Sequence, residues 1–448
     1  MKLLYIFCSI LFLSGCSQNK SLLKIRDTNN TQQLKEKKIE VVEDLIDFNQ
    51  NVEAYIPESL QERYISSLEE YEANYFMPWN IKKITISLED AKWAYRAFSP
   101  KNSYGENLQP LQESFFQDIY SRSNFKDFAT LNQKAITLKA INIRAFPTDK
   151  PLFMNPNKAG EGFPFDYLQN SLIAPNKPVL VSHYSKDKEW VFIQSSFTYG
   201  WVKAHDIVYI PIKYTKLYKE AQKEFLIQEG SAIYDENGNF LFRSRIGMLL
   251  PEINATQENF TVLTISNYKN RQAYYMKSKL SKNIAHKGIL LFNKKNIIRI
   301  FKEVSKVKYG WGGMYGQRDC SSILRDFYAP FGIWLPRNSS KQSKVGRVIS
   351  FKNLSNDEKI YLIKKEAIPF ETLLYKKGHI LLYVGIKKGK IVVFHNAWGI
   401  KTKKNSKEGR FIIGKPIFST LEVGSNLKNY DKDASILTQL KSMNILTQ

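Results

Sequence analysis

The chain has 448 residues, of which 43% are hydrophobic and 24% charged. This length suits two to four domains, and the hydrophobic fraction excludes a disordered polyelectrolyte. The formal net charge of +24 argues against a near-neutral intracellular metabolic enzyme and favours an anionic partner such as nucleic acid, a phospholipid surface or a cell-wall polymer. With only three cysteines, Cys8, Cys16 and Cys320, a disulfide scaffold and a four-cysteine zinc site are excluded.

The first sixteen residues predict the compartment. Met1-Lys2 precedes an apolar run over 3–15, which is typical of a secretory signal and shorter than the roughly 20 apolar residues of a membrane-spanning helix. Leu13-Ser14-Gly15-Cys16 resembles the bacterial lipoprotein box. That resemblance implies removal of residues 1–15 and a lipid on Cys16, which would anchor the protein to the inner or outer membrane, facing the periplasm. The alternative is an ordinary cleaved signal followed by an incidental cysteine.

A tether and a helical segment are expected next. Residues 16–56 begin with a polar stretch rich in Lys, Asn, Gln and Thr, so we expect a lipidated tether there. The segment 57–132 is expected to be helical, because apolar residues recur at helical spacing from about Pro57 and again over roughly 110–130. The first of these two sets contains Leu60, Tyr64, Leu68 and Tyr71.

Short strands are predicted in the middle of the chain. Over 133–211, the strand candidates Trp190-Val191-Phe192-Ile193 and Tyr199-Gly200-Trp201-Val202 indicate a small barrel, and the Gly-Trp-Val element resembles bacterial SH3-like domains. Residues 212–292 are expected to form a second such barrel, with a turn at Asp235-Glu236-Asn237-Gly238. Three histidines of this region lack ligand-like spacing and are expected at the surface or partly packed, with no metal: His183, His205 and His286.

Residues 293–448 carry the candidate chemistry. Tyr309-Gly310-Trp311-Gly312-Gly313 lacks the Lys of a phosphate loop, so its glycines are expected to let the backbone pass close to another element or a ligand. Asp319 is a good helix N-cap and places Cys320 in the first turn, where the helix terminus is expected to lower the thiol pKa. The alternative is a small buried cysteine without chemistry.

Two histidines favour the catalytic interpretation. His379 begins one strand candidate, His395 ends the next, and Lys387-Lys388-Gly389-Lys390 is typical of the hairpin turn between them. The two histidines are therefore expected on neighbouring antiparallel strands. A helix-borne cysteine packed against them would combine a nucleophile, a base and an orienting group.

Together these motifs resemble the NlpC/p60 family of papain-like cysteine peptidases, which cleave peptidoglycan stem peptides. The resemblance implies an α+β fold, with a papain-like domain behind one or two SH3-like barrels and an N-terminal helical segment. It also implies cleavage of the γ-D-glutamyl–diamino acid bond through a thioester, without metal or cofactor. Cys320 would be the nucleophile, His379 the base and His395 its orienting partner. Substrate would be held by Tyr309, Asp319 and Ser321, with Tyr309 also a candidate oxyanion donor beside the Cys320 N–H.

Two other functions stay open on the same motifs. The protein could be a catalytically inert wall-binding lipoprotein, or an amidase or acyltransferase on the same fold, since all such reactions pass through a thioester. A nucleic-acid partner is not expected, because the signal sequence removes the protein from nucleic acid and the Lys residues are spread over the chain. The expected partners are peptidoglycan stem peptides and, through Cys16, a membrane.

Overall fold

A computed structural model describes residues 40–268 and 272–447. The predicted signal peptide over 1–15 and the predicted lipid attachment at Cys16 lie outside these residues. Within them, no helix combines the length and the apolar character needed to cross a bilayer.

The tether expected over 16–56 does not extend to its predicted end. Residues 41–56 form α1 (Asp44–Asp47) and the short helix η1 (Val52–Ala54), and they pack on the C-terminal domain. The Thr420 N–H donates to Asp44 Oδ2 at 2.6 Å, and the Tyr55 ring stacks on Phe418 at 4.6 Å between centroids. The prediction is wrong here because a few apolar side chains of this stretch are buried against the C-terminal domain. Their burial stabilises an ordered structure despite the polar residues around them.

The N-terminal helical segment contains short helices. They are α2 (Leu68–Tyr75), α3 (Met77–Asn80), α4 (Leu88–Ala91), α5 (Trp93–Ala97) and α6 (Glu113–Arg122). The helix expected from Pro57 begins only at Leu68, because the Ser67 side chain caps it by accepting the Glu70 N–H at 3.1 Å. Ahead of this cap residues 57–66 form no helix, and Arg63 forms a β-bridge with Phe292. The second predicted helical stretch is α6.

A first β-domain follows, with one apolar core of its own. Its strands are β1 (Gln133–Thr137), β2 (Ile141–Arg144), β3 (Gln169–Ile173), β4 (Pro178–Tyr184), β5 (Trp190–Ser195), β6 (Tyr199–Lys203) and β7 (Ile207–Tyr209). The expectation that His183 is at most partly packed is wrong. Its ring is buried beside Trp201, and its Nε2 lies 3.0 Å from the Ser123 carbonyl oxygen.

After α7 (Ile212–Glu220), a second β-domain has a separate core. Its strands are β8 (Lys223–Leu226), β9 (Ala232–Tyr234), β10 (Phe240–Arg243), β11 (Leu249–Ala255), β12 (Asn259–Tyr268), β13 (Gln272–Ser281) and β14 (Ala285–Lys287). The predicted turn at 235–238 joins β9 to β10. Strands β7 and β13 pair in parallel and link the two β-domains into one sheet of the order β14-β8-β11-β12-β13-β7-β1-β4-β5-β6-β2-β3.

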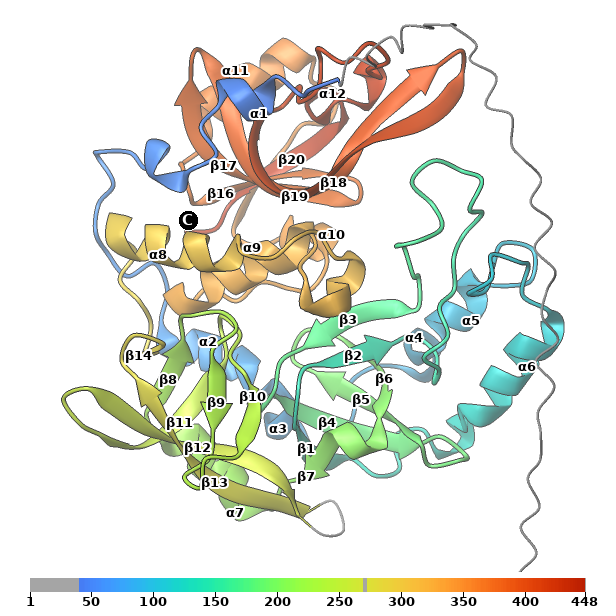
Figure 1. The fold of residues 1–448 in the computed structure, drawn as a ribbon, viewed down its shortest axis with the longest axis vertical. Helices are drawn as coiled ribbons and strands as arrows, with labels where there is room; N and C mark the ends of the chain where they lie inside the picture. Colours follow the sequence, from blue (N-terminus) through green and yellow to red (C-terminus); the bar gives the residue numbers. More distant parts are fainter. Residues whose placement is uncertain (1–39, 269–271, 448) are drawn as a thin grey trace, which may run out of the picture. The chain divides into compact units, whose positions relative to one another are not determined.

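The C-terminal domain has a six-stranded antiparallel sheet of the order β15-β20-β16-β17-β18-β19. Its strands are β15 (Arg347–Ser350), β16 (Thr372–Lys376), β17 (His379–Lys387), β18 (Lys390–Lys404), β19 (Lys407–Thr420) and β20 (Leu440–Ile445), and its helices are α8 (Lys294–Val304), α9 (Cys320–Tyr328), α10 (Ser339–Gln342), α11 (Asn356–Glu366) and α12 (Ile436–Gln439). Figure 1 shows α8 and α9 between this sheet and the β-domains. The predicted hairpin is present, since β17 and β18 pair across the turn at 388–389.

Candidate active site

Cys320 is the first residue of α9, and a capping box fixes this end of the helix. Asp319 Oδ1 accepts the Ser322 N–H at 2.8 Å, while the Ser322 hydroxyl accepts the Asp319 N–H at 2.8 Å. Helix α9 packs on β17, and the backbone N–H of Ile380 is close enough to the thiol to lower the pKa of Cys320. The fold therefore places the sulfur beside the residue that follows His379.

The helix terminus does not make Cys320 acidic. Burial raises the pKa of the thiol to about 12, and the Asp319 carboxylate adds to the rise. The N–H groups of Ile380 and Ser321 oppose it only in part. The expectation of a lowered pKa is wrong because the sulfur is withdrawn from water, which penalises the thiolate more than the helix terminus favours it. The resting side chain is a neutral thiol and needs a base.

The two histidines meet as the sequence suggested. His379 Nε2 lies 2.8 Å from His395 Nδ1, and His395 Nε2 lies 3.0 Å from Ser419 Oγ. The Ser419 hydroxyl donates its one proton to the Thr420 carbonyl oxygen at 3.0 Å, so it must accept from His395 Nε2–H. Neutral His395 then accepts from His379 Nε2–H. This assignment from the hydrogen-bond network leaves His379 Nδ1 with a free lone pair.

Both imidazole rings are neutral at neutral pH. Burial lowers the pKa of His379 to about 3, and the nearby Lys376 ammonium lowers it further. Burial also lowers the pKa of His395 well below its usual value, with His379 and Lys376 contributing. Lys376 stands directly opposite His379 in the β16–β17 hairpin. A neutral imidazole on the strand that α9 packs against is in the protonation state that general-base activation of a neutral thiol requires.

Asp319 is held by Arg337, which the sequence analysis missed. Arg337 donates to Asp319 Oδ2 at 2.6 Å, to Ser321 Oγ at 3.0 Å and to Ser171 Oγ at 2.6 Å. Burial alone would raise the pKa of Asp319, but the guanidinium outweighs it and holds the pKa below its ordinary value. Arg337 thus joins β3 of the first β-domain to the residue that precedes Cys320.

The glycine-rich segment packs against β3, as its composition predicted. A Cβ on Gly312, which has φ +58°, would lie 2.4 Å from the Gln169 carbonyl oxygen, and one on Gly313 would lie 2.7 Å from Leu172 Cβ. The Gln169 side chain donates to the Gly312 carbonyl oxygen at 3.1 Å. These glycines therefore allow the first β-domain to approach the backbone next to Tyr309.

Two clefts meet at this point. The first has a volume of about 790 Å³ and is lined by Tyr309, Asp319, Cys320 and Ser321, with walls from the first β-domain and the N-terminal helices. The second has a volume of about 580 Å³ and is lined by His379 and His395 together with Tyr309. Tyr309, Trp311 and Gly378 border both clefts, so the candidate nucleophile opens to one side of a shared edge and the candidate base to the other.

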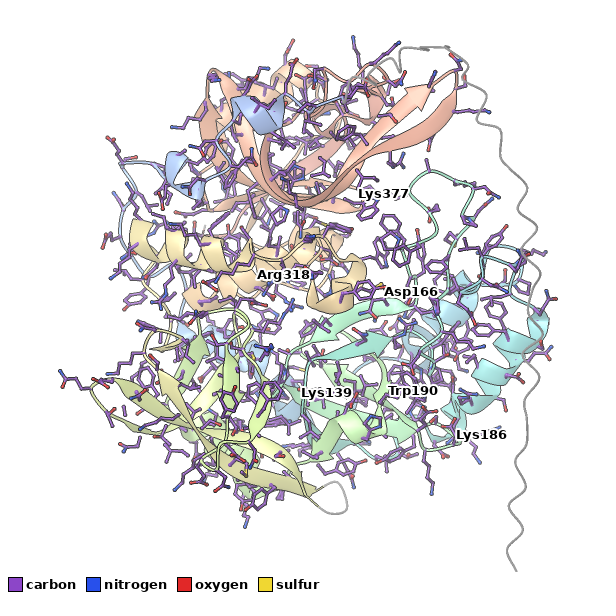
Figure 2. All side chains as sticks on the ribbon, in the orientation of Figure 1. Lys139, Asp166, Lys186, Trp190, Arg318 and Lys377 are labelled. Atoms are coloured by element: carbon purple, nitrogen blue, oxygen red, sulfur yellow. The ribbon has the colours of Figure 1, made fainter. Side chains whose placement is uncertain are left out.

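The edge between the clefts is anchored on the first β-domain. The Asp166 carboxylate pairs with Arg144 at 2.6 Å, and the backbone carbonyl oxygen of Asp166 accepts the Trp311 indole N–H at 2.9 Å. Phe165 packs against both Trp311 and Trp398, each at 5.3 Å between ring centroids. Figure 2 labels Asp166 and, on the C-terminal domain, Lys377, which lines the second cleft together with Phe165.

Burial also defines the state of Tyr309. It raises the pKa of the phenol well above its usual value, with Cys320 and Asp319 adding to the rise. The hydroxyl therefore stays protonated and can donate a hydrogen bond. The Cys320 N–H lies in the first turn of α9, where an α-helix offers no internal acceptor. The two groups predicted to meet an oxyanion are thus both available as donors at the candidate nucleophile.

Four family models match parts of the chain. Residues 306–407 match the NlpC/P60 family, and residues 5–128 match the NLPC_P60 stabilising domain, N term. Residues 151–203 match the SH3 domain of SH3b1 type, and residues 225–257 the SH3 domain of SH3b2 type. The C-terminal domain therefore belongs to the NlpC/P60 cysteine peptidase family. The predicted fold class is confirmed, including the second SH3-like domain.

Two solved structures are among those similar to this chain. An NlpC/P60 endopeptidase from Photobacterium damselae subsp. piscicida superposes with a TM-score of 0.78 at 23% identity, covering 92% of this chain and 98% of that one. An NlpC/P60 family protein from Bacillus cereus has a TM-score of 0.45 at 14% identity, covering 70% of this chain and 100% of that one. The first likeness supports the fold over nearly the whole chain. Comparison with curated proteins gives no match.

Proposed function

We propose that the protein is a cysteine endopeptidase that hydrolyses the γ-D-glutamyl–diamino acid bond of peptidoglycan stem peptides. The observation that carries the proposal is the buried Cys320 beside the start of β17, with the chain His379–His395–Ser419 behind it. Such a chain fixes the proton positions that a thiol nucleophile and its base need. Membership of the C-terminal domain in the NlpC/P60 family supports peptidoglycan as the substrate class and an extracytoplasmic location.

In the first step, His379 Nδ1 takes the thiol proton as Cys320 Sγ attacks the scissile carbonyl carbon. The resulting imidazolium is stabilised by its Nε2–H···Nδ1 hydrogen bond to His395. The oxyanion accepts hydrogen bonds from the Cys320 N–H and the Tyr309 hydroxyl. His379 then gives its proton to the leaving amine, and a thioester remains on Cys320.

In the second step, water is deprotonated by His379 and attacks the thioester carbonyl. The acid product leaves, and the proton returns to the Cys320 sulfur, which restores the neutral pair. Because Cys320 and His379 are both neutral before each turnover, both steps require proton transfer. His379 therefore acts as base and then as acid in each half of the reaction. No metal or organic cofactor takes part in this scheme.

The first cleft suits the amino-terminal half of the stem peptide. Asp319 Oδ1 is occupied by the helix cap, Ser321 and Arg337, whereas Oδ2 accepts only from Arg337 among its hydrogen bonds to described residues. A carboxylate oxygen has room for another donor, so Oδ2 can receive the free ammonium of L-alanine. Asp319 can therefore both cap α9 and bind substrate. The first β-domain closes this cleft and favours short peptides with a free amino end.

The test is digestion of purified muropeptides with mass readout of the fragments. Release of an L-alanyl-γ-D-glutamate fragment is expected from the wild type, and Cys320→Ala and His379→Ala should lower the rate by about 10³-fold or more. His205→Ala, which removes an exposed histidine of the first β-domain, should leave it unchanged. Equal product from wild type and Cys320→Ala would refute the mechanism. Release of intact stem peptide would instead indicate an amidase, and binding to sacculi without product would indicate an inert wall-binding protein.

We also propose that Cys16 carries a lipid that anchors the protein to a membrane facing the periplasm. The support is the sequence Leu13-Ser14-Gly15-Cys16 at the end of the apolar run. Labelling with a fatty acid in cells should mark the wild type and not Cys16→Ala, which should also leave the membrane fraction. Equal labelling of both proteins would contradict the anchor.

A further inference from the structure

A third cavity, separate from the two clefts, lies where four parts of the chain meet. Its volume is about 40 Å³. The N-terminal helices, both β-domains and the C-terminal domain each contribute to its wall. The polar side chains that they supply include Tyr71 of α2, Lys177 ahead of β4, Arg245 ahead of β11 and Arg325 of α9. The reaction scheme uses none of these side chains.

The charges at this cavity do not balance. Asp326 pairs with Arg318 at 2.8 Å and with Arg325 at 3.0 Å. Arg245 lies 3.5 Å from Asp326 and 3.8 Å from Glu229. Glu229 also pairs with Arg318, at 2.7 Å. Three guanidinium groups therefore share two carboxylates, which leaves one positive charge in excess.

Lys177 adds a second positive charge to this excess. Its side chain is only 7% exposed, and its ammonium nitrogen lies 3.4 Å from the centroid of the Tyr75 ring. A ring face attracts a cation, but it does not satisfy three N–H donors. Within the described part of the chain, no oxygen accepts from Lys177 Nζ and no carboxylate pairs with it. Burial lowers the pKa of Lys177 well below its usual value, and the Arg325 guanidinium lowers it further, so a negative charge nearby would favour the ammonium.

Two other donors at the cavity also lack an acceptor. Arg325 Nη1 is buried without a hydrogen-bond partner. The Tyr71 hydroxyl forms no hydrogen bond to the residues that the structure describes, although the side chain is 3% exposed. Together with Lys177 Nζ, these are three donors from three parts of the chain at one cavity. Water could accept from them but would leave the charge uncompensated, whereas an anion supplies both the acceptor and the charge.

The size of the cavity limits the anion. One water needs roughly 10–15 Å³ of such a volume. A cavity of about 40 Å³ therefore has room for a halide ion with a water or two, and not for a phosphate ester or a sugar acid.

We propose that this cavity is a binding site for a small monovalent anion such as chloride, held by Lys177 Nζ, Arg325 Nη1 and the Tyr71 hydroxyl. The site is independent of the proposed peptidase activity. Phe197 and Trp334 line both this cavity and the first cleft, so the anion lies behind a wall of that cleft. Because the folded chain brings the donors together and the unfolded chain does not, the anion stabilises the fold.

The first test locates the anion directly. Crystals of the protein are soaked in sodium bromide, and the anomalous scattering of bromine shows where the halide binds. A peak is expected within hydrogen-bond distance of Lys177 Nζ. Absence of a peak from this cavity would overturn the proposal, wherever else bromide binds on the protein.

The second test measures unfolding by urea in sodium chloride and in sodium gluconate at equal ionic strength, since gluconate is too large for the cavity. Above the dissociation constant of the site, the folding equilibrium constant should rise about tenfold for each tenfold rise in chloride. Gluconate should not produce this rise. Lys177→Met should lose the chloride dependence, because it replaces the buried ammonium by an apolar chain of similar length.

Lys213→Met is the matched control. Lys213 also lies over a tyrosine ring, that of Tyr214 at 4.7 Å, but it is exposed and does not line the cavity. This variant should keep the full chloride dependence. An equal chloride dependence in the wild type and in Lys177→Met would overturn the proposal. If Lys177→Met does not fold, the bromide experiment on the wild type decides.

Discussion

Ser419 is expected to control catalysis although it touches neither substrate nor nucleophile. Its hydroxyl is fully buried, accepts from His395 Nε2–H at 3.0 Å and donates to the Thr420 carbonyl oxygen. Ser419→Ala removes the acceptor and leaves two outcomes for His395. In the first, the buried His395 Nε2–H loses its hydrogen-bond acceptor. In the second, His395 changes tautomer and presents Nδ1–H to His379 Nε2. The proton of His379 then moves to its Nδ1, which can no longer act as the base.

The size of the effect follows from the unsatisfied group. A buried donor left without a partner costs about 1–3 kcal/mol, and each 1.36 kcal/mol in the barrier is tenfold in rate. The expected loss in kcat for Ser419→Ala is therefore about 5- to 150-fold. Neither cleft is lined by Ser419, so KM should change little.

The assay is steady-state cleavage of purified muropeptides, with nitrogen NMR of the histidines as a second readout. Wild-type His379 should show an unprotonated Nδ1, and in Ser419→Ala this signature should be lost or mixed. Ser343→Ala is the control, because Ser343 is also a buried serine and its hydroxyl donates to the Ser340 carbonyl oxygen. This variant should leave kcat and the NMR spectrum unchanged. An unchanged kcat and tautomer in Ser419→Ala would refute the assignment of the proton chain.

Three other outcomes are expected. Thiolate absorbance of the wild type minus that of Cys320→Ala should be near zero at neutral pH and rise only towards pH 12, because burial raises the pKa of the thiol to about 12; a thiolate signal at neutral pH would contradict this. Arg337→Met should lower the free energy of unfolding in denaturant by about 3–5 kcal/mol, because it leaves the Asp319 carboxylate buried and unpaired. An unchanged free energy of unfolding would contradict a stabilising role for this ion pair. Burial lowers the pKa of His183 to about 4, so between pH 6.5 and 4 the unfolded chain holds a proton that the folded one does not. The free energy of unfolding should fall there by about 1.4 kcal/mol for each pH unit lost, and His183→Gln should flatten this slope; equal slopes would argue against the buried neutral ring.

The sequence predicted the features that depend on local patterns. Two apolar strand candidates and the turn signal at 387–390 predicted His379 and His395 on paired strands, and the aspartate before Cys320 predicted the helix cap. The glycines at 312–313 were correctly expected to permit a close approach. Each of these follows from backbone geometry within a short segment, which a single sequence contains.

The missed features depend on contacts between distant segments. Arg337 lies in a loop without periodicity, and one of its hydrogen-bond partners, Ser171, belongs to another domain. Burial raises the pKa of Cys320, and the position of the cysteine at a helix terminus does not reveal how deeply other elements bury it. Ser419 lies on β19, and the pairing of β19 with β18 sets the register that brings Ser419 to His395.

The most direct measurement is mass spectrometry of muropeptides after incubation with the wild type and with Cys320→Ala at equal concentration. The wild type should release a fragment cut between D-glutamate and the diamino acid, and Cys320→Ala should release none above background. The same fragment in equal amount from both proteins would show that Cys320 is not the nucleophile of a peptidoglycan endopeptidase.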